Sequence, residues 1–166
     1  MKTIVSVMTA GAILTAGGFV APLAAQKSAH VIQTTTEAQW GQAPPMLPAG
    51  AQIAVLAGDP TKASAYTIRL KFPAGYAIPA HSHPTDENVV VISGALTFGM
   101  GEKMAKGAAT NKTLPAGGYA LMPANMNHFA YTAAQETTIV LYGLGPVEFK
   151  YVNASDDPRT ARPGTK

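Results

Sequence analysis

The most regular pattern of apolar and polar positions lies in the segment AYTIRLKF, residues 65–72. Its apolar positions are Tyr66, Ile68, Leu70 and Phe72, and polar residues separate them. Side chains two residues apart lie on the same face of an extended chain. This period of two therefore predicts a β-strand with one buried face.

Short apolar runs continue along the chain, separated by turn sequences such as FPAG, PTD and LPAGG. The runs are IAVLA (53–57), YAIPAHSH (76–83), ENVVVISG (87–94), ALTFGMG (95–101), YALMP (119–123), NHFAYTA (127–133), TTIVLYG (137–143) and VEFKYVN (147–153). We expect eight or nine short strands and no amphipathic helix, with the polar segment 102–112 as a surface loop. An all-β, antiparallel barrel is the natural arrangement, because closure leaves few unpaired strand edges.

The N-terminal segment is typical of a secretory signal peptide. Lys2 is followed by an uncharged stretch from Thr3 to Gln26, rich in Ala, Gly, Val and Leu, and we expect cleavage after Ala25 or nearby. An uncleaved membrane anchor is the alternative, because the stretch is long enough to span a bilayer. Both readings predict an exported protein, periplasmic or secreted, with no integral membrane domain beyond that possible anchor.

The remaining boundaries follow from changes in composition. We divide the chain into a signal peptide (1–25), an extended N-terminal arm or linker (26–50), the β-barrel (51–153) and a polar tail (154–166). Trp40 and Met46 are expected to pack the arm onto the barrel. The basic end of the tail is expected to be solvated.

Composition narrows the classes of function. Of the 166 residues, 47% are hydrophobic and 13% are charged, which is typical of a globular domain. The net charge is +3, and no basic stripe is interleaved with aromatic residues, so nucleic acid is not expected as a partner. The chain has no cysteine, so any metal site must use His, Asp or Glu.

Two of the four histidines, His81 and His83, are two residues apart, so on a strand both side chains point to one face. Glu87 follows after the PTD turn and is expected at the start of the next strand. His128, at the start of a later strand, is the remaining candidate, because His30 lies in the arm and is expected to be solvated. Three imidazoles and one carboxylate suit a divalent first-row metal ion, and Mn, Fe, Ni, Cu and Zn all accept this set.

The spacing of these residues resembles that of the cupin superfamily. Gly75, His81, His83, Glu87 and Gly94 match the first cupin motif, and Gly117, Pro123 and His128 are similar to the second. Asn125 stands where the second motif usually has glycine, and Thr132 where it often has asparagine. Asn tolerates a positive φ, so the turn is expected to be kept.

The resemblance, over about residues 50 to 150, implies a single-domain cupin-type jelly-roll barrel with His81, His83, Glu87 and His128 as the ligands of one divalent ion. It also implies a homodimer. The three methionines near the motifs are expected to fill the core or the barrel mouth rather than to bind copper; they are Met100, Met122 and Met126.

Two functions remain open from the sequence. The first is an exported metal-dependent enzyme of the oxygenase, isomerase or decarboxylase type, acting on a small oxygen-rich molecule. The second is a non-catalytic cupin that binds or senses a small molecule through its metal. A structural or storage role has no support in the sequence. Possible substrate contacts are Arg69, Asn88, Tyr119 and Tyr131, although a bulge in a strand would invert the face on which any of them lies.

Overall fold

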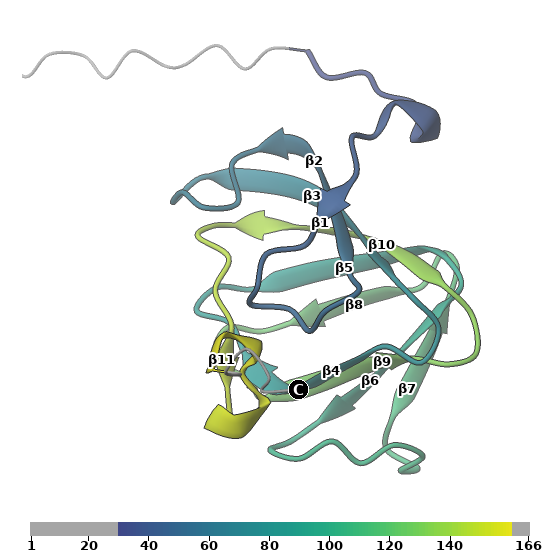
Figure 1. Cartoon of the computed structure of the whole chain (residues 1–166), viewed down its shortest axis with the longest axis vertical. Helices are drawn as coiled ribbons and strands as arrows, with labels where there is room; N and C mark the ends of the chain where they lie inside the picture. The colour runs from purple at the N-terminus through teal and green to yellow at the C-terminus, as the bar shows by residue number, and fades with distance from the viewer. Residues whose placement is uncertain (1–29, 161–166) are drawn as a thin grey trace, which may run out of the picture. The chain divides into compact units, whose positions relative to one another are not determined.

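The computed structural model describes residues 30–160, and residues 31–160 belong to one unit built from two antiparallel β-sheets (Figure 1). The predicted signal peptide lies outside the described residues. Among the described residues the helices are single 3-10 turns, and none has the length or apolar character needed to cross a bilayer. These turns are η1 (Thr35–Glu37), η2 (Ala154–Asp156) and η3 (Pro158–Thr160).

The two sheets face each other as the layers of a jelly roll. In spatial order, the six-stranded sheet contains β1 (Gly41–Gln42), β2 (Gln52–Gly58), β3 (Ala65–Phe72), β10 (Thr137–Leu144), β5 (Glu87–Ser93) and β8 (Tyr119–Met122). The five-stranded sheet contains β11 (Lys150–Tyr151), β4 (Ala77–Ser82), β9 (His128–Thr132), β6 (Ala95–Met100) and β7 (Lys112–Pro115). The predicted all-β, antiparallel jelly-roll barrel is confirmed.

The strands agree closely with the apolar runs, and the differences are local. The strand predicted at 65–72 coincides with β3. Only two residues of the run 147–153 pair as a strand, β11. The sequence did not predict β1, in the arm, or β7, at the end of the polar loop. Both are edge strands, whose polar composition carries little signal.

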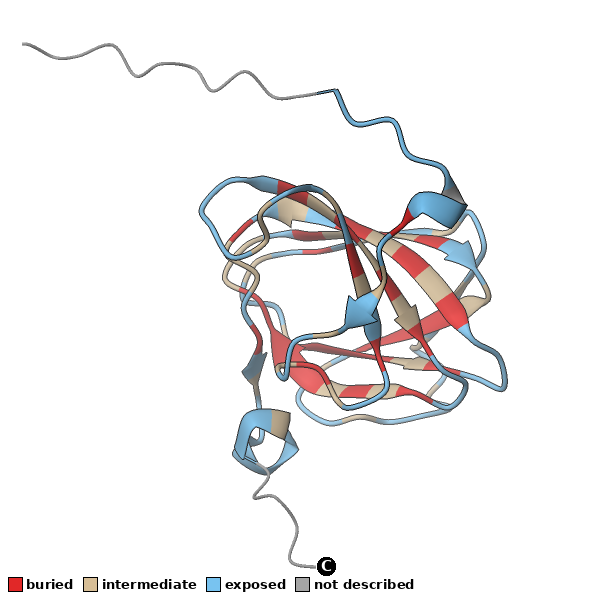
Figure 2. Ribbon diagram, turned by 45° about the horizontal axis from the view of Figure 1, so that its top comes forward, coloured by how far each residue is buried: buried red, intermediate tan, exposed pale blue. Residues whose placement is uncertain are grey.

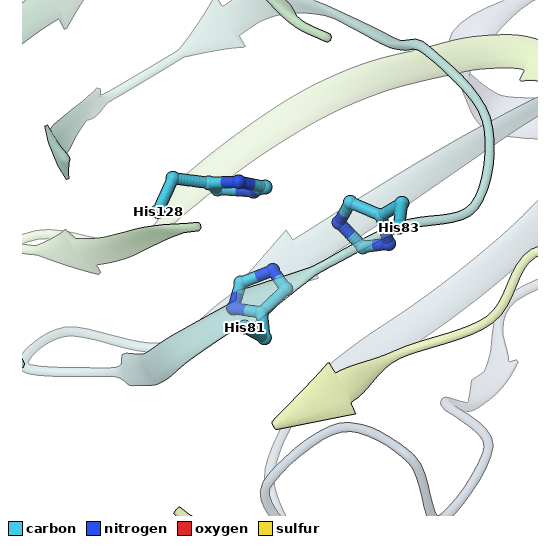
Figure 3. A group of neighbouring side chains, drawn as sticks. All are labelled: His81, His83 and His128. Carbon is cyan, nitrogen blue, oxygen red and sulfur yellow. The ribbon is translucent and has the colours of Figure 1, made fainter. Parts of the chain in front are cut away.

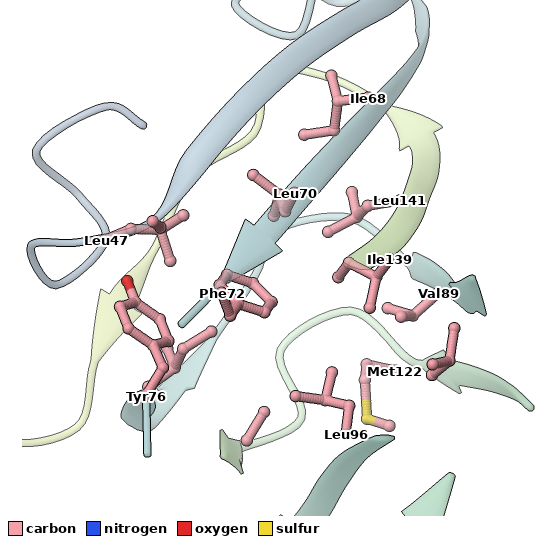
Figure 4. Packing of buried hydrophobic residues seen from close by; sticks show 14 of the residues in the cluster. Leu47, Ile68, Leu70, Phe72, Tyr76, Val89, Leu96, Met122, Ile139 and Leu141 are labelled. Atoms are coloured by element: carbon pink, nitrogen blue, oxygen red, sulfur yellow. The ribbon is translucent and has the colours of Figure 1, made fainter. Parts of the chain in front are cut away.

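The core lies between the sheets, where the inward-facing residues of the longer strands are buried (Figure 2). On β3, the four alternating apolar side chains are all buried, as the period of two predicts. Phe72 stacks on Tyr76 with 4.9 Å between ring centroids, and both contact the cluster drawn in Figure 4. The interior of the barrel is therefore filled mainly by aliphatic and aromatic side chains.

Residues 38–50 of the arm lie against the barrel. Leu47 is buried in the core cluster, and Met46 packs against that cluster. The hydroxyl of Tyr76 donates to the carbonyl of Pro48 (2.5 Å), and that of Tyr151 donates to the carbonyl of Met46 (2.8 Å). Trp40 contributes differently, because its ring lies 4.5 Å from Nζ of Lys71 on β3. Trp40 and Met46 both contact the barrel, as expected.

The described part of the tail also contacts the barrel. The Arg159 guanidinium donates to the carbonyl of Phe149 at 2.9 Å and forms two bonds with the carboxylate of Asp157 (2.8 and 2.7 Å). Arg159 therefore holds the chain next to β11 while its side chain remains exposed, in agreement with the expected solvation; the basic residues beyond it lie outside the described residues.

Candidate metal centre

The structure brings His81, His83, Glu87 and His128 together between the two sheets; they are called the four-residue centre below. His81 lies on β4, and His83 directly follows that strand. Glu87 is the first residue of β5 in the opposite sheet, and His128 is the first residue of β9. The centre thus forms where the chain crosses from one sheet to the other, and all four side chains are buried.

Pairing of strands and turns sets these positions. His81 and His128 are register partners across β4 and β9. The backbone N–H of Asn125 donates to the carbonyl of His83 (2.7 Å), and Oδ1 of Asp86 accepts from the N–H of Ala124 (2.8 Å). Asn125 has φ = 61°, so the positive φ expected for this glycine-like turn position is confirmed.

The potential ligand atoms converge without bonding to one another. One ring nitrogen from each histidine lies within 4.8 Å of the other two (Figure 3). The Glu87 oxygens lie 3.4 Å from Nε2 of His83 and 3.7 Å from Nε2 of His128, beyond good hydrogen-bond length. Two ligand atoms that each lie about 2.1 Å from one ion are at most about 4.2 Å apart. The most widely separated histidine nitrogens would therefore have to approach each other by less than about 1 Å to reach that limit.

The other ring nitrogen of each histidine meets a backbone carbonyl. Nδ1 lies 2.6 Å from the carbonyl oxygen of Pro79 for His81, 2.7 Å from that of Glu148 for His83, and 3.0 Å from that of Met126 for His128. A carbonyl can only accept, so each Nδ1 carries the proton when the ring is neutral, and each Nε2 presents a lone pair. This is the arrangement in which histidines bind metals.

Two further observations fit a divalent ion. Nε2 of His83 is buried and has no hydrogen-bond partner, a costly state for a polar atom unless a ligand meets it. Burial, together with the neighbouring His128 and His83, lowers the pKa of His81 to about 3. His81 therefore stays neutral and able to ligate well below neutral pH.

Glu87 supplies the negative charge of the centre. Burial acts to raise the pKa of its carboxyl, but His83 and His128 act against burial, and the net pKa lies below its ordinary value. The carboxylate is therefore ionised at neutral pH. Three neutral imidazoles with one carboxylate would leave a divalent ion with a net charge of about +1, which favours an anionic ligand.

The space beside the centre is small and apolar. A cavity of about 20 Å³ adjoins His81, Glu87 and His128, and apolar side chains form the rest of its lining. This is room for about one water molecule. Within the described residues, the lining contributes no acid or base other than members of the centre.

Phe149 is a part of the site that the sequence analysis did not identify. Its ring stacks on His81, with centroids 4.7 Å apart, and meets His83 edge-on at 4.6 Å. The segment 147–153 was predicted as a plain strand, so nothing in its pattern distinguished Phe149 from an ordinary core residue.

Tyr66 is a buried residue in the same sheet as Glu87. It and Glu87 are both register partners of Gly143 on β10, and the hydroxyl of Tyr66 lies 3.5 Å from the position that a Cβ of Gly143 would take. Burial, with Glu87 nearby, raises the pKa of Tyr66 well above its ordinary value. The phenol is therefore protonated at neutral pH and can donate a hydrogen bond but cannot act as a base.

The four possible substrate contacts do not line the cavity. Arg69 lies on the outward face of β3. Asn88 accepts a hydrogen bond from the hydroxyl of Tyr119 (2.7 Å), and both side chains belong to the exposed face of the six-stranded sheet. The hydroxyl of Tyr131 accepts from the N–H of Gly107 and from the amide of Asn111 in the loop before β7. The regular alternation along β5 and β9 puts Asn88 and Tyr131 on the face opposite the ligands.

The other candidate residues have structural roles or lie in solvent. Met122 is in the core as expected, whereas Met100 and Met126 are exposed. His30 is exposed, in agreement with its expected solvation. The hydroxyl of Thr132 accepts from the N–H of Tyr76 and donates to the carbonyl of Pro73, so it fastens β9 to the turn before β4.

A comparison with protein families identifies one family for this chain. The model of a family described as "Domain of unknown function (DUF4437)" matches residues 31–163. No curated protein matches the sequence.

Three solved structures illustrate the likeness. An RmlC-like cupin from Shewanella frigidimarina is 12% identical, with 77% of this chain and 96% of that chain covered and a TM-score of 0.52. KdgF from Halomonas sp. is 17% identical over 76% and 96%, with a TM-score of 0.51. The polyketide cyclase RemF from Streptomyces resistomycificus is 16% identical over 65% and 75%, with a TM-score of 0.52. At these identities the likeness establishes a shared fold.

Proposed function

The chain belongs to the family described as domain of unknown function DUF4437 and has the cupin fold, and from this premise we propose that it is an exported metal-dependent enzyme. The four-residue centre holds one divalent ion. The substrate is a small molecule with an anionic oxygen, such as a carboxylate or an enolate. The reaction is of the oxygenase, isomerase or decarboxylase type.

One observation carries the proposal: three Nε2 lone pairs and an ionised carboxylate converge in a buried space, each imidazole oriented by a carbonyl on its other nitrogen. Without an ion, three lone pairs and one negative charge would meet in an apolar interior, at a considerable desolvation cost. A divalent cation relieves that cost. The donor set accepts Mn, Fe, Ni, Cu or Zn.

When bound, such an ion supplies a Lewis acid for an anionic oxygen, and Mn or Fe adds one-electron chemistry. The protein's own part is to keep the His81 imidazole neutral, to hold Glu87 ionised, and to orient all three imidazoles through the carbonyls at Nδ1. Its apolar walls exclude water. Tyr66, a buried residue of β3 that stays protonated, shares the register partner Gly143 with Glu87. RemF, which has the same fold, is described as a cyclase, which agrees with an enzymatic role.

The proposal includes export and self-association. Residues 1–25 have the pattern of a signal peptide, so the mature protein is periplasmic or secreted. A homodimer would form through the outer face of the six-stranded sheet, which exposes several large apolar side chains. These are Ile92 on β5, Tyr119 and Leu121 on β8, and Tyr142 on β10. Association would remove this apolar area from water.

Elemental analysis tests the metal assignment. Protein purified without chelator should contain about one divalent ion per chain, and Glu87→Gln or His83→Ala should remove most of it. Glu136→Gln is the matched control for Glu87→Gln, because it is the same substitution with the same loss of charge at an exposed position outside the centre, and it should leave the metal content unchanged. Equal metal content in wild-type protein, Glu87→Gln and His83→Ala would overturn the assignment.

A non-catalytic role in binding is the second candidate, and the small cavity favours it. Its volume is about 20 Å³, and its lining offers no acid or base beyond the centre. A panel of diketones, flavonoids and hydroxy acids, incubated with Mn- and Fe-loaded protein, separates the two functions. Product formation that is lost in His83→Ala supports the enzyme, whereas saturable binding without turnover supports the binding protein.

A further inference from the structure

We propose that a second, apolar cavity next to the four-residue centre binds the hydrocarbon part of the ligand, so that the ligand is a small carboxylate or enolate with a short apolar side group. This inference rests on the proposed function, because the centre must anchor the oxygen end of the ligand. The second cavity has a volume of about 60 Å³ and lies between the arm and the inner face of the six-stranded sheet.

The two cavities share a wall. Leu47, Leu70, Leu141 and Phe149 line both of them. Phe149 is the member of this wall that contacts the centre, since its ring stacks on His81. A rotation of that ring, or a shift of the arm at Leu47, would join the two spaces. A ligand anchored at the centre would then extend into the second cavity.

The lining of the second cavity selects for hydrocarbon. Its far side consists of Met46 from the arm, Ile53 from β2, and Val147 from the chain before β11. No charged side chain contributes, and the hydroxyl of the exposed Thr61 is the one polar side-chain group in the lining. A sugar or another polyhydroxylated molecule would leave most of its hydroxyls without partners there, which is costly. An alkyl group or a small ring would lose nothing by entering.

The volume sets the size of that group. A space of about 60 Å³ holds about four water-sized spheres, since one water requires roughly 10–15 Å³ on this measure. A chain of about three to five carbon atoms fits. The alternative is that the second cavity is only a packing gap between the arm and the barrel. In that case the affinity for the ligand would not depend on its chain length.

Calorimetric titration with straight-chain carboxylates, from acetate to octanoate, tests the proposal without measuring activity. Protein loaded with one equivalent of Zn²⁺ is suitable, because zinc has no redox chemistry. Each added methylene should tighten binding about fourfold up to about hexanoate, since burying one methylene contributes about 0.8 kcal/mol. Beyond that length the affinity should level off. A flat series would overturn the inference.

Two variants alter the cavity in opposite directions. Val147→Phe fills it and should abolish the dependence on chain length while leaving acetate binding unchanged. Met46→Ala enlarges it and should move the plateau to longer chains; its backbone carbonyl, the acceptor for Tyr151, is retained. Val55→Phe is the matched control for Val147→Phe, because Val55 is exposed on β2 and does not line the cavity; it should behave as wild type. Wild-type behaviour of Val147→Phe and Met46→Ala would also overturn the inference.

The outcomes distinguish the two proposals. If the protein holds zinc and binds acetate but shows no effect of chain length, the inference fails and the metal centre stands. If it holds no metal, the proposed function fails, and with it the anchor that the inference needs. If longer carboxylates bind equally well to protein stripped of metal, the second cavity binds apolar molecules independently of the centre, and the inferred two-part ligand is wrong.

Discussion

His81 on β4 and His128 on β9 lie directly opposite each other in the five-stranded sheet, with 4.4 Å between their ring centroids. Each ring is held by a carbonyl two residues earlier in its own chain segment, that of Pro79 or of Met126. Strand pairing and local backbone bonds therefore fix this half of the candidate centre before any ion binds.

The first prediction concerns acid stability of the metal-free protein. The pKa of His81 is about 3 in the folded protein against an ordinary 6.5, so between these values the unfolded chain binds the extra proton. The free energy of unfolding should then fall as pH falls from about 6.5 towards 3, by about 1.4 kcal/mol per pH unit at most. Urea unfolding at pH 7, 6, 5 and 4 measures this slope. His81→Leu should flatten it, and His30→Leu, in the exposed arm, should not; identical slopes in all three proteins would contradict the prediction.

The second prediction concerns Phe149. Replacing it with alanine removes a buried ring that packs on His81 and His83, and should cost about 3 kcal/mol of unfolding free energy. Chemical denaturation of metal-free protein measures the loss. Leu144→Ala, at an exposed position of β10, should change stability by less than about 0.5 kcal/mol. A similar small change in Phe149→Ala would mean that the ring is not packed as described.

The third prediction concerns the attachment of the arm. Tyr76→Phe and Tyr151→Phe each remove a hydroxyl that donates to an arm carbonyl, and each should cost about 1 kcal/mol. In the double variant, limited proteolysis should cut within residues 40–50 faster than in the wild type. Tyr142→Phe is the control, because this tyrosine is exposed on the outer face of the six-stranded sheet. Unchanged cleavage in the double variant would show that packing of Leu47 alone holds the arm.

The fourth prediction concerns the turn at Asn125. Its φ of 61° is in the left-handed region, so Asn125→Val should be destabilising by about 1–2 kcal/mol. The turn also donates to the carbonyl of His83, so metal content should fall as well. Asn125→Gly relieves the strain and should retain both stability and metal. Thermal melting measures the stability of the two variants, and elemental analysis measures their metal content.

The fifth prediction concerns self-association. Leu121→Glu puts a charge on the exposed apolar face of the six-stranded sheet and should convert the proposed dimer to a monomer in light scattering. Val152→Glu, an equally exposed valine next to β11 in the other sheet, should remain dimeric. A monomeric wild-type protein would refute the dimer directly.

Much of the fold could be read from local patterns. The alternation in residues 65–72 predicted β3 and its buried face, because a half-buried strand repeats every two residues whatever its partners. The turn at Asn125 was predictable for a similar reason, since a positive φ restricts the residue type locally. The edge strands β1 and β7 were missed because a short polar strand has no such signature.

For the centre, spacing predicted which four residues would meet, and strand pairing then set how they meet. The register of β4 with β9, the carbonyls that orient each imidazole, and the contact of Phe149 with His81 all join segments distant in sequence. Asn88, Tyr119 and Tyr131 show the same limit, because the sequence could not exclude a bulge, and only the structure showed that these side chains lie opposite the ligand face. A period of two indicates which residues share a face of a strand. Only the pairing of strands across the barrel determines which face points inward and which residues it contacts.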